Sequence, residues 1–367
     1  MTVPMADLPA QYTALKPELD AAIARVMSTG GFILGPTVTA CETQVAALCG
    51  AKHGIGVGNG TDALLLSLMA LGIGPGDEVI TPPFTFVATV ETVVLLGATP
   101  VFADIDPVHF TLDPADVARK LTPRTKAIVP VHLFGQLADM EGLRAFGLPL
   151  IGDGAQAIGA AQHGQEVAQW SELTTLSFYP TKNLGAAGDG GMILTNDDAL
   201  AARLRLLHFH GSGGKYDYHL VGVCSRLDAL QAAILNVKLP HLATWNEARR
   251  TNAAFYDQAL ADIEGLVLPK TRAGNVHTFH QYTVRVPNGT RAPLKAFLAE
   301  RGIATGIFYP VALHLAPAYA ERFGGKLGDH PESERACEEV LSLPIFPELS
   351  EAQRVSVVES IHAFFGG

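Results

Sequence analysis

Short apolar runs alternate with segments of helical length between residues 50 and 195. Each run contains four to six residues, mostly apolar or Thr, as expected for strands buried on both faces of a sheet. We predict seven strands, over residues 54–57, 78–81, 100–103, 127–131, 148–152, 173–178 and 191–195. Helices are predicted between several of them, for example over 61–71 and 84–96. This order predicts an α/β fold with a mostly parallel seven-stranded sheet covered by helices.

The pattern changes on either side of this block. Leu15, Leu19, Ile23 and Val26 repeat at helical spacing and predict an N-terminal helix. Elements predicted after the block are helices over 227–239, 245–263, 293–301 and 351–365, and strands over 281–286 and near 305–309. We therefore predict a large domain with an N-terminal helical arm over residues 1–240 and a smaller α+β domain over 241–367.

Composition narrows the class of protein. The chain has 367 residues and a net charge of −10, without a run of Lys or Arg, which argues against a broad nucleic-acid-binding surface. The N-terminus lacks the pattern of a signal peptide, and the apolar stretches are shorter than a membrane span. No pair of the four cysteines has CxxC spacing, so neither a metal site nor a disulfide framework is indicated. We expect a soluble cytoplasmic protein.

The segment Gly58–Asp62 follows the first predicted strand and opens a helix. Gly60 and Thr61 at a helix N-terminus suit a phosphate, because free N–H groups and the positive end of the helix dipole lie there. An ordinary strand-to-helix turn capped by Asn59 or Thr61 is the alternative, and taken alone the more frequent one. The segment is neither a GxGxxG fingerprint nor a P-loop, which disfavours dinucleotides and nucleoside triphosphates as ligands.

Two more strand ends carry candidate groups. Asp153 follows a wholly apolar strand, where a carboxylate can hold a pyridine nitrogen protonated or simply cap a turn. Lys182 stands between a buried strand and a glycine-rich stretch, in surroundings that favour a neutral, nucleophilic amine over a solvated one. Ser177 can donate its hydroxyl to a phosphate. A phosphate cradle, a ring-nitrogen acid and a lysine in this order are what pyridoxal 5′-phosphate (PLP) requires.

At this point the sequence resembles the DegT-like nucleotide-sugar aminotransferases, which are fold type I PLP enzymes. The resemblance covers nearly the whole chain. It rests on the motifs GFILGP (31–36), NGTDAL (59–64), GPGDEV (74–79), PFTFVAT (83–89), DGAQ (153–156) and SRLD (225–228), together with Asp7-Leu8, Gln11-Tyr12, Ser177-Phe178, Lys182-Asn183 and Tyr309-Pro310.

The resemblance implies roles for individual residues. Lys182 becomes the Schiff-base lysine and general acid–base, Asp153 pairs with the pyridine nitrogen, and Gln156 lies near the ring hydroxyl. Phe86 stacks on the ring, although a plain core position is the alternative. The residues implied for the phosphate are Gly60, Thr61, Ser177 and, from the neighbouring subunit of a homodimer, Cys224. Cys224 replaces the asparagine usual at that position, and a thiol is a weak donor.

The resemblance also implies the reaction. An amino group passes from L-glutamate to the ketone of a nucleotide-linked sugar, and the motifs look most like enzymes that act on carbon 3. The implied substrates are UDP-3-keto-2-acetamido-glucuronate or a dTDP-3-keto-6-deoxyhexose, for amino-sugar and polysaccharide biosynthesis. The implied substrate contacts are Phe32, His210, Arg226, Tyr309 and His314. Arg226 suits a uronate carboxylate, but pairing with Asp228 or with the diphosphate are alternatives.

Three competing functions remain. A PLP-dependent sugar dehydratase shares the scaffold, but such relatives replace the lysine by histidine. A non-catalytic PLP-fold regulator predicts a broken cofactor set or an added basic segment, whereas Lys182, Asp153 and Phe86 are all present. An NAD-dependent sugar enzyme lacks support because the dinucleotide fingerprint is missing.

Overall fold

The computed structural model describes residues 2–366. Its central strands are β1 (His53–Val57), β2 (Glu78–Thr81), β3 (Thr99–Phe102), β4 (Thr125–Ile128), β5 (Ile151–Asp153), β8 (Leu173–Ser177) and β9 (Gly191–Thr195). They form two sheets, ordered β1-β9-β8-β5 and β3-β2-β4, which the parallel bridges Ile128–Leu150 and Val131–Asp153 join into one layer. Only β9 runs antiparallel to its neighbours within this layer. The predicted mostly parallel seven-stranded sheet is confirmed.

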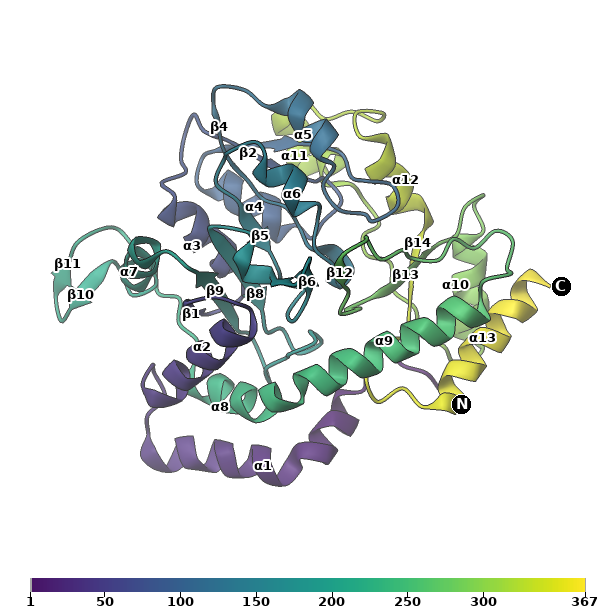
Figure 1. The fold of residues 1–367 in the computed structure, drawn as a ribbon, viewed down its shortest axis with the longest axis horizontal. Helices are drawn as coiled ribbons and strands as arrows, with labels where there is room; N and C mark the ends of the chain where they lie inside the picture. Colours follow the sequence, from purple (N-terminus) through teal and green to yellow (C-terminus); the bar gives the residue numbers. More distant parts are fainter. Residues whose placement is uncertain (1, 367) are drawn as a thin grey trace.

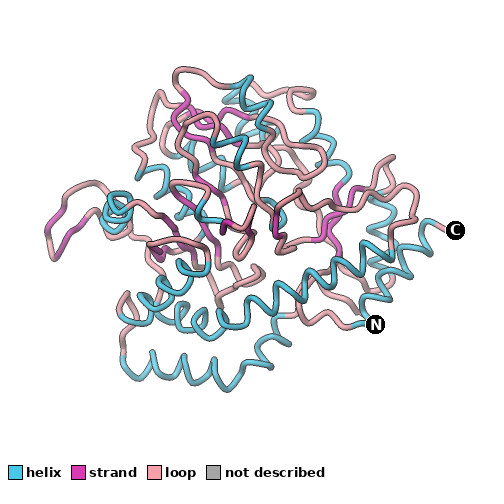
Figure 2. The backbone as a smooth tube through the Cα atoms, viewed as in Figure 1, coloured by secondary structure: helices cyan, strands magenta, loops and turns pink. Residues whose placement is uncertain are grey.

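Helices cover both faces of the sheet (Figures 1 and 2). The helices of this part are α1 (Leu8–Thr29), α2 (Pro36–Leu48), α3 (Gly60–Ala70), α4 (Ala88–Leu95), α5 (Pro114–Lys120), α6 (Met140–Arg144), α7 (Asp198–Leu207) and α8 (Ala229–Lys238). Successive sheet residues face different cores: Val79 packs in the cluster that includes α3 and α7, and Ile80 in the cluster that includes α2 and α8. Each strand is therefore buried on both faces, which explains its continuous apolar run.

The C-terminal part has its own core. It contains helices α9 (Leu242–Ala259), α10 (Arg291–Glu300), α11 (Pro317–Phe323), α12 (Pro331–Glu339) and α13 (Glu351–Phe365), and the antiparallel strands β13 (Tyr282–Arg285) and β14 (Val340–Leu343). Tyr256, Tyr282, Leu298 and Ile361 pack there together with Val3 from the N-terminal end. Figure 1 shows both chain ends at this side of the molecule. The domain boundary at residue 240 stays a prediction.

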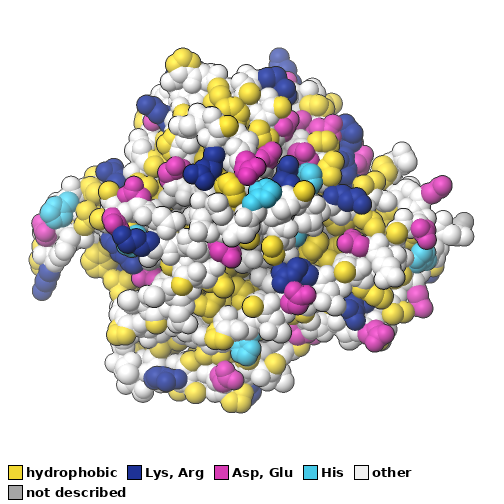
Figure 3. All heavy atoms as spheres, in the orientation of Figure 1, with side chains coloured by type: hydrophobic (Ala, Val, Ile, Leu, Met, Phe, Trp, Pro, Cys, Tyr) yellow, Lys and Arg dark blue, Asp and Glu magenta, His cyan; other side chains and the backbone are white. Residues whose placement is uncertain are grey.

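Short strands complete the fold. One three-stranded sheet joins β6 (Ala161–Gln162), β7 (Gln165–Glu166) and β12 (Asn275–Val276). A hairpin of β10 (Ser212–Gly214) and β11 (Asp217–Tyr218) projects from the body of the molecule, at the left of Figure 1. Within residues 2–366, no helix has the length and apolar character needed to span a bilayer. On the face drawn in Figure 3, basic and acidic side chains are interspersed.

Two predicted elements differ from the structure. The helix predicted over 84–96 begins only at Ala88. The chain just before it is held by a tertiary contact, in which the Pro83 carbonyl accepts from Leu313 N at 2.8 Å, and by a local one, in which the Thr85 hydroxyl lies 3.1 Å from that of Thr89. The strand predicted near 305–309 is reduced to a single bridge between Gly306 and Ser342. Phe308 and Tyr309 there pack against an aromatic cluster rather than along a neighbouring strand.

Candidate active site

The candidate residues meet at one edge of the sheet. Strands β5 and β8 are parallel, and β1 runs in the same direction because both β1 and β8 pair antiparallel with β9. Their carboxyl ends therefore lie together. Asp153 ends β5, Lys182 follows β8, and Gly60 follows β1. Ligands of open α/β sheets bind at this edge.

The start of α3 forms a tight cradle against the end of β8. The Asn59 side chain caps the helix by accepting from Asp62 N at 2.8 Å, and the first-turn amides of Gly60 and Thr61 have no earlier turn to pair with. A Cβ atom on Gly60 would lie 2.8 Å from the Cβ of Ser177. A Cβ on Gly191 would lie 2.4 Å from the Asn59 carbonyl. Gly60 is needed for the close approach to the Ser177 side chain, and Gly191 for the close approach to the Asn59 backbone.

Ser225 connects this cradle to the segment that carries Cys224 and Arg226. Its hydroxyl accepts from Gly58 N at 2.9 Å and donates to Asp62 Oδ2 at 2.7 Å. Ser225 is buried, so these bonds fix the segment beside the helix start. Ser225 lies within the SRLD motif but was not among the predicted site residues.

Asp153 is the buried acid of the site, with 5% of its surface exposed. Its Oδ2 accepts from the Thr89 hydroxyl at 2.9 Å and its Oδ1 from Ala155 N at 3.2 Å. Burial raises the pKa of Asp153, while these two hydrogen bonds and the charge of Lys182 oppose that rise. Thr89 was not predicted as a site residue, because a threonine within an apolar stretch gives no signal of the carboxylate that it meets.

Lys182 lies half-buried in the connection between β8 and β9. Desolvation lowers the pKa of its ammonium group to about 8, and the negative charge of Asp153 counteracts part of that shift. The sequence-based expectation of a desolvated amine agrees with this direction. A lysine with this lowered pKa is neutral in a larger fraction of molecules near physiological pH than an ordinary lysine, which suits a nucleophile and proton carrier.

Gln156, Tyr309 and Phe86 line the same region. The Gln156 side chain accepts from Phe134 N at 2.6 Å and donates to the Tyr309 hydroxyl at 3.3 Å. The rings of Phe86 and Tyr309 have centroids 6.1 Å apart. Phe86 is 54% exposed, so the alternative of a plain core residue does not describe it. The three residues form one wall, although their individual roles stay predictions.

The predicted sugar and cross-subunit residues are less enclosed. Phe32 is 40% exposed, and Cys224 and His210 are exposed as well. Arg226 is half-buried, and its guanidinium lies over the Phe209 ring at 5.1 Å from the centroid. Within residues 2–366, Arg226 forms no ion pair with Asp228 or with any other acidic side chain.

His314 has different surroundings from the other predicted substrate contacts. It is 1% exposed, and its Nε2 lies 3.0 Å from Glu334 Oε1. Its ring packs against Phe102 and His330. These contacts suit a residue that ties the segment after Tyr309 to α12, and its role as a substrate contact stays a prediction.

The fold and the arrangement at its sheet edge define a class. A mostly parallel sheet with an acid at one strand end, a desolvated lysine after another and a glycine-bounded helix start after a third is the organisation of fold type I PLP-dependent enzymes. The chain belongs to the DegT/DnrJ/EryC1/StrS aminotransferase family, whose sequence profile matches residues 13–362. The predicted fold class and family are thereby confirmed.

Similar proteins cover the whole chain. A Geobacillus stearothermophilus protein named "Pleiotropic regulatory protein" is 53% identical across 100% of this chain and 99% of its own length. An Acidithiobacillus ferrooxidans protein named UDP-N-acetyl-3-dehydro-alpha-D-glucosamine 3-aminotransferase is 45% identical across 100% of this chain and 98% of its own. The crystal structure of S. venezuelae DesV is 44% identical, with a TM-score of 0.97 over 100% of this chain and 99% of that one.

The family implies PLP, and a solved relative carries its aminated form, PMP. The site residues fit this group. Gly60 leaves the space beside Ser177 that a Cβ would fill, and amide and hydroxyl donors there suit a phosphate. A buried carboxylate at Asp153 suits a protonated ring nitrogen, and the lowered pKa of Lys182 suits attack on an aldehyde.

Proposed function

We propose that this aminotransferase moves an amino group from L-glutamate to carbon 3 of a keto sugar carried by a nucleotide. The single observation that carries the proposal is that a desolvated Lys182 and a buried Asp153 lie at the ends of neighbouring strands on the same sheet edge, close enough for each charge to influence the other. The carbon-3 assignment is supported by relatives 45% and 46% identical, whose names describe 3-aminotransferases of UDP-linked and dTDP-linked sugars.

Each residue has a stated part in this reaction. When bound, PLP supplies an electron sink for the bonds at the amino carbon. Lys182 Nζ, neutral above about pH 8, would take a proton from the amino-bearing carbon of the donor and, in the second half-reaction, deliver one to the sugar carbon that is aminated. Asp153 presents its carboxylate to the ring nitrogen, with Thr89 fixing the orientation of one oxygen.

The other predicted cofactor residues hold the cofactor in place and do not take part in proton transfer. Gly60, Thr61 and Ser177 bind the phosphate, while Phe86 and Gln156 contact the ring. The Tyr309 hydroxyl accepts from the same Gln156 and so extends the wall toward the sugar.

The sugar nucleotide lies over the more exposed side of the site. Arg226, His210 and Phe32 contact it there, and the free guanidinium of Arg226 meets either a uronate carboxylate or the diphosphate. Relatives with both UDP-linked and dTDP-linked substrates support either nucleotide.

We further propose a homodimer that works in the cytoplasm. The hairpin and the segment between it and Cys224 carry exposed apolar residues, Tyr216, Tyr218 and Val221 at 78%, 65% and 89% exposure, which a second subunit would cover. Cys224 then faces the partner's phosphate site. Sedimentation or light scattering would measure the assembly, and a monomer with full activity would contradict it.

An absorbance spectrum tests the central proposal. The purified protein with PLP should show the visible band of a lysine-linked cofactor, and L-glutamate should convert it to the spectrum of PMP. A panel of UDP-linked and dTDP-linked 3-keto sugars should then restore the visible band with the true acceptor. A band that L-glutamate leaves unchanged would reject the donor, and no band at all would reject the site.

A regulatory function is the second candidate, because the relative that is 53% identical bears a regulator's name. Such a protein would bind PLP or PMP without releasing aminated sugar. Multiple turnovers of product per chain in the acceptor panel favour the enzyme, whereas cofactor binding without turnover across that panel favours the regulator. The intact pair of Lys182 and Asp153 supports catalysis.

A further inference from the structure

The segment that carries Lys182 is fixed on two sides. We define the Lys182 loop as residues 178–190, between β8 and β9. Within it, Lys182 N donates to Tyr179 O and Ala186 N to Phe178 O, both at 2.8 Å. On one side Lys238 of α8 donates to Gly185 O at 2.8 Å. The other side rests on a buried polar group that the proposed mechanism does not use.

That group is Asn183, which is 5% exposed. Its Nδ2 donates to Asn246 Oδ1 at 2.8 Å and to Thr278 O at 3.0 Å. Its Oδ1 lies 3.2 Å from His280 Nδ1. The three partners come from α9 and from the segment just before β13, so one side chain joins the Lys182 loop to the C-terminal part of the chain.

The donor and the acceptor in each hydrogen bond of Asn183 follow from the groups that its amide carries. Both hydrogens of the Asn183 amide are used by oxygen acceptors, so Oδ1 faces His280 as an acceptor. His280 must therefore carry a hydrogen on Nδ1. Burial and the positive charges of Lys182 and Arg249 lower the pKa of His280 well below its ordinary value, so the ring is neutral and has this single tautomer.

We propose that Asn183 and His280 are positioning residues for Lys182, which lock its loop onto the C-terminal part of the chain and keep water from the amine. The inference rests on the proposed function, in which Lys182 bonds the cofactor. A buried hydrogen-bond network rigidifies what it joins, and loss of one member leaves its partners unpaired in a dry environment. Arg249 supports the lock by donating to Phe279 O at 3.2 Å and Ile345 O at 2.8 Å.

The test measures how fast the apoprotein takes up PLP as a function of pH. Only the neutral amine attacks the aldehyde, so the rate in the natural protein should rise with a midpoint near pH 8. In Asn183→Ala and His280→Leu, water reaches the loop, and the midpoint should move by about one unit toward the ordinary lysine value. Turnover should fall about tenfold to a hundredfold, with little change in the KM for the sugar nucleotide.

Two variants serve as controls. His280→Asn places an amide donor where Nδ1 stands, so it should keep the midpoint of the natural protein. Lys238→Met removes the α8 contact of the same loop and should lower thermal stability without moving the midpoint. An unchanged midpoint in His280→Leu, or an equal shift in His280→Asn or Lys238→Met, would overturn the proposal.

A second experiment distinguishes a failure of the positioning role from a failure of the proposed function. Borohydride reduction followed by peptide mapping identifies the lysine that carries PLP in the natural protein. A label on another residue would reject the proposed function. A label on Lys182 together with unchanged midpoints in Asn183→Ala and His280→Leu would reject only the positioning role.

Discussion

The residues predicted for the cofactor and those predicted for the sugar lie in contrasting surroundings. Asp153 is 5% exposed and hydrogen-bonded through both oxygens, and Gln156 is bonded at both ends of its amide. Among the residues predicted for the sugar, Phe32 is 40% exposed and His210 is exposed, whereas His314 is buried at 1% exposure. On the cofactor side Phe86, at 54% exposure, and the exposed Cys224 are the exceptions.

The contrast separates chemistry from selectivity. Groups that change the protonation of a reacting atom must be held in a fixed geometry, and the chain provides this with internal hydrogen bonds. Groups that choose a substrate lie on connecting segments, which accept substitution without disturbing the sheet. Substitutions on the two sides should therefore differ in which kinetic constant they change.

The largest effect is expected at Lys182. In Lys182→Ala the group that carries the proton is gone, so turnover should fall by at least about a thousandfold. PLP should then bind only non-covalently, with the spectrum of free cofactor. Steady-state rates with the acceptor found in the panel measure this. Lys238→Ala, which removes another buried lysine, is the matched control, and ordinary turnover in Lys182→Ala would refute the assignment.

Asp153→Asn should have the next largest effect. The amide keeps the shape and the Thr89 contact but removes the charge that stabilises a protonated ring nitrogen, so kcat should fall about a hundredfold. Thr89→Val leaves the charge in place and should cost less than Asp153→Asn. Equal losses in both variants would mean that the hydrogen bond, rather than the charge, matters.

Gly60→Ala should weaken PLP binding about tenfold. The added Cβ would lie 2.8 Å from Ser177 Cβ, which is closer than carbon atoms approach, so Ser177 or the helix start must move apart. Gly74→Ala is the control, because a Cβ there meets no atom within 4 Å. Titration of apoprotein with PLP gives the affinities, and equal affinity in the two variants would remove Gly60 from the cradle.

Arg226→Gln should have a smaller effect, and on a different constant. Loss of the cation should raise the KM for the sugar nucleotide about threefold to tenfold while kcat stays within about twofold. The half-reaction with L-glutamate alone should be unaffected. A fall in kcat without a change in KM would place Arg226 with the cofactor residues instead.

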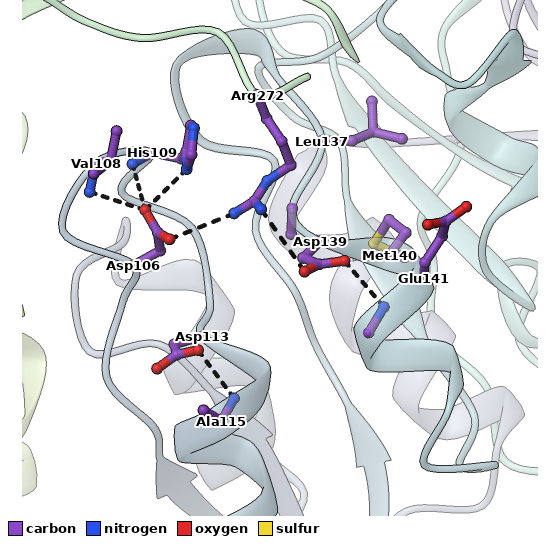
Figure 4. A network of polar contacts seen from close by, with 12 residues as sticks. Asp106, Val108, His109, Asp113, Ala115, Leu137, Asp139, Met140, Glu141 and Arg272 are labelled. Atoms are coloured by element: carbon purple, nitrogen blue, oxygen red, sulfur yellow. Dashed lines mark hydrogen bonds and ion pairs between the residues drawn. The ribbon is translucent and has the colours of Figure 1, made fainter. Parts of the chain in front are cut away.

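Asp106→Asn should not affect turnover, because this residue belongs to neither side. Figure 4 shows its carboxylate accepting from Val108 N, His109 N and His109 Nδ1, with Arg272 at 3.7 Å. Burial alone would raise the pKa of Asp106, but its hydrogen bonds with His109 and Val108 lower it to about 2. The variant should lose about 1–2 kcal/mol of unfolding free energy.

Because the pKa of Asp106 is lowered in the folded protein, the stabilisation by its carboxylate decreases as the pH falls. The charged carboxylate stabilises the fold above its ordinary pKa of 3.8, and this contribution is lost as the pH falls through about 2. The difference between natural protein and variant in urea unfolding should be constant from pH 8 to pH 5 and shrink below pH 4. A difference that already changes between pH 8 and pH 5 would assign the effect to a group other than the Asp106 carboxylate.

The sequence predicted the sheet and the named cofactor residues because local patterns carry that information. An apolar run of strand length, and a polar group at its end, can each be recognised from a few neighbouring residues. The partners that fix those groups are distant: Thr89 lies 64 residues from Asp153, and Asn246 lies 63 residues from Asn183. The surroundings of His314 could not be predicted from its place in the sequence, because its contact with Glu334 depends on where α12 packs.

The antiparallel direction of β9 has a consequence for the order of folding. Strands β8 and β9 enclose only residues 178–190, whereas β9 pairs with β1 across more than a hundred residues. The short closure costs less chain entropy, so the hairpin that carries Lys182 can form early during synthesis. Asn246 and His280 are made later, so they can bond to Asn183 only after at least residue 280 has been synthesised. In a nascent chain the Lys182 loop therefore forms before the partners that fix it to the C-terminal part exist.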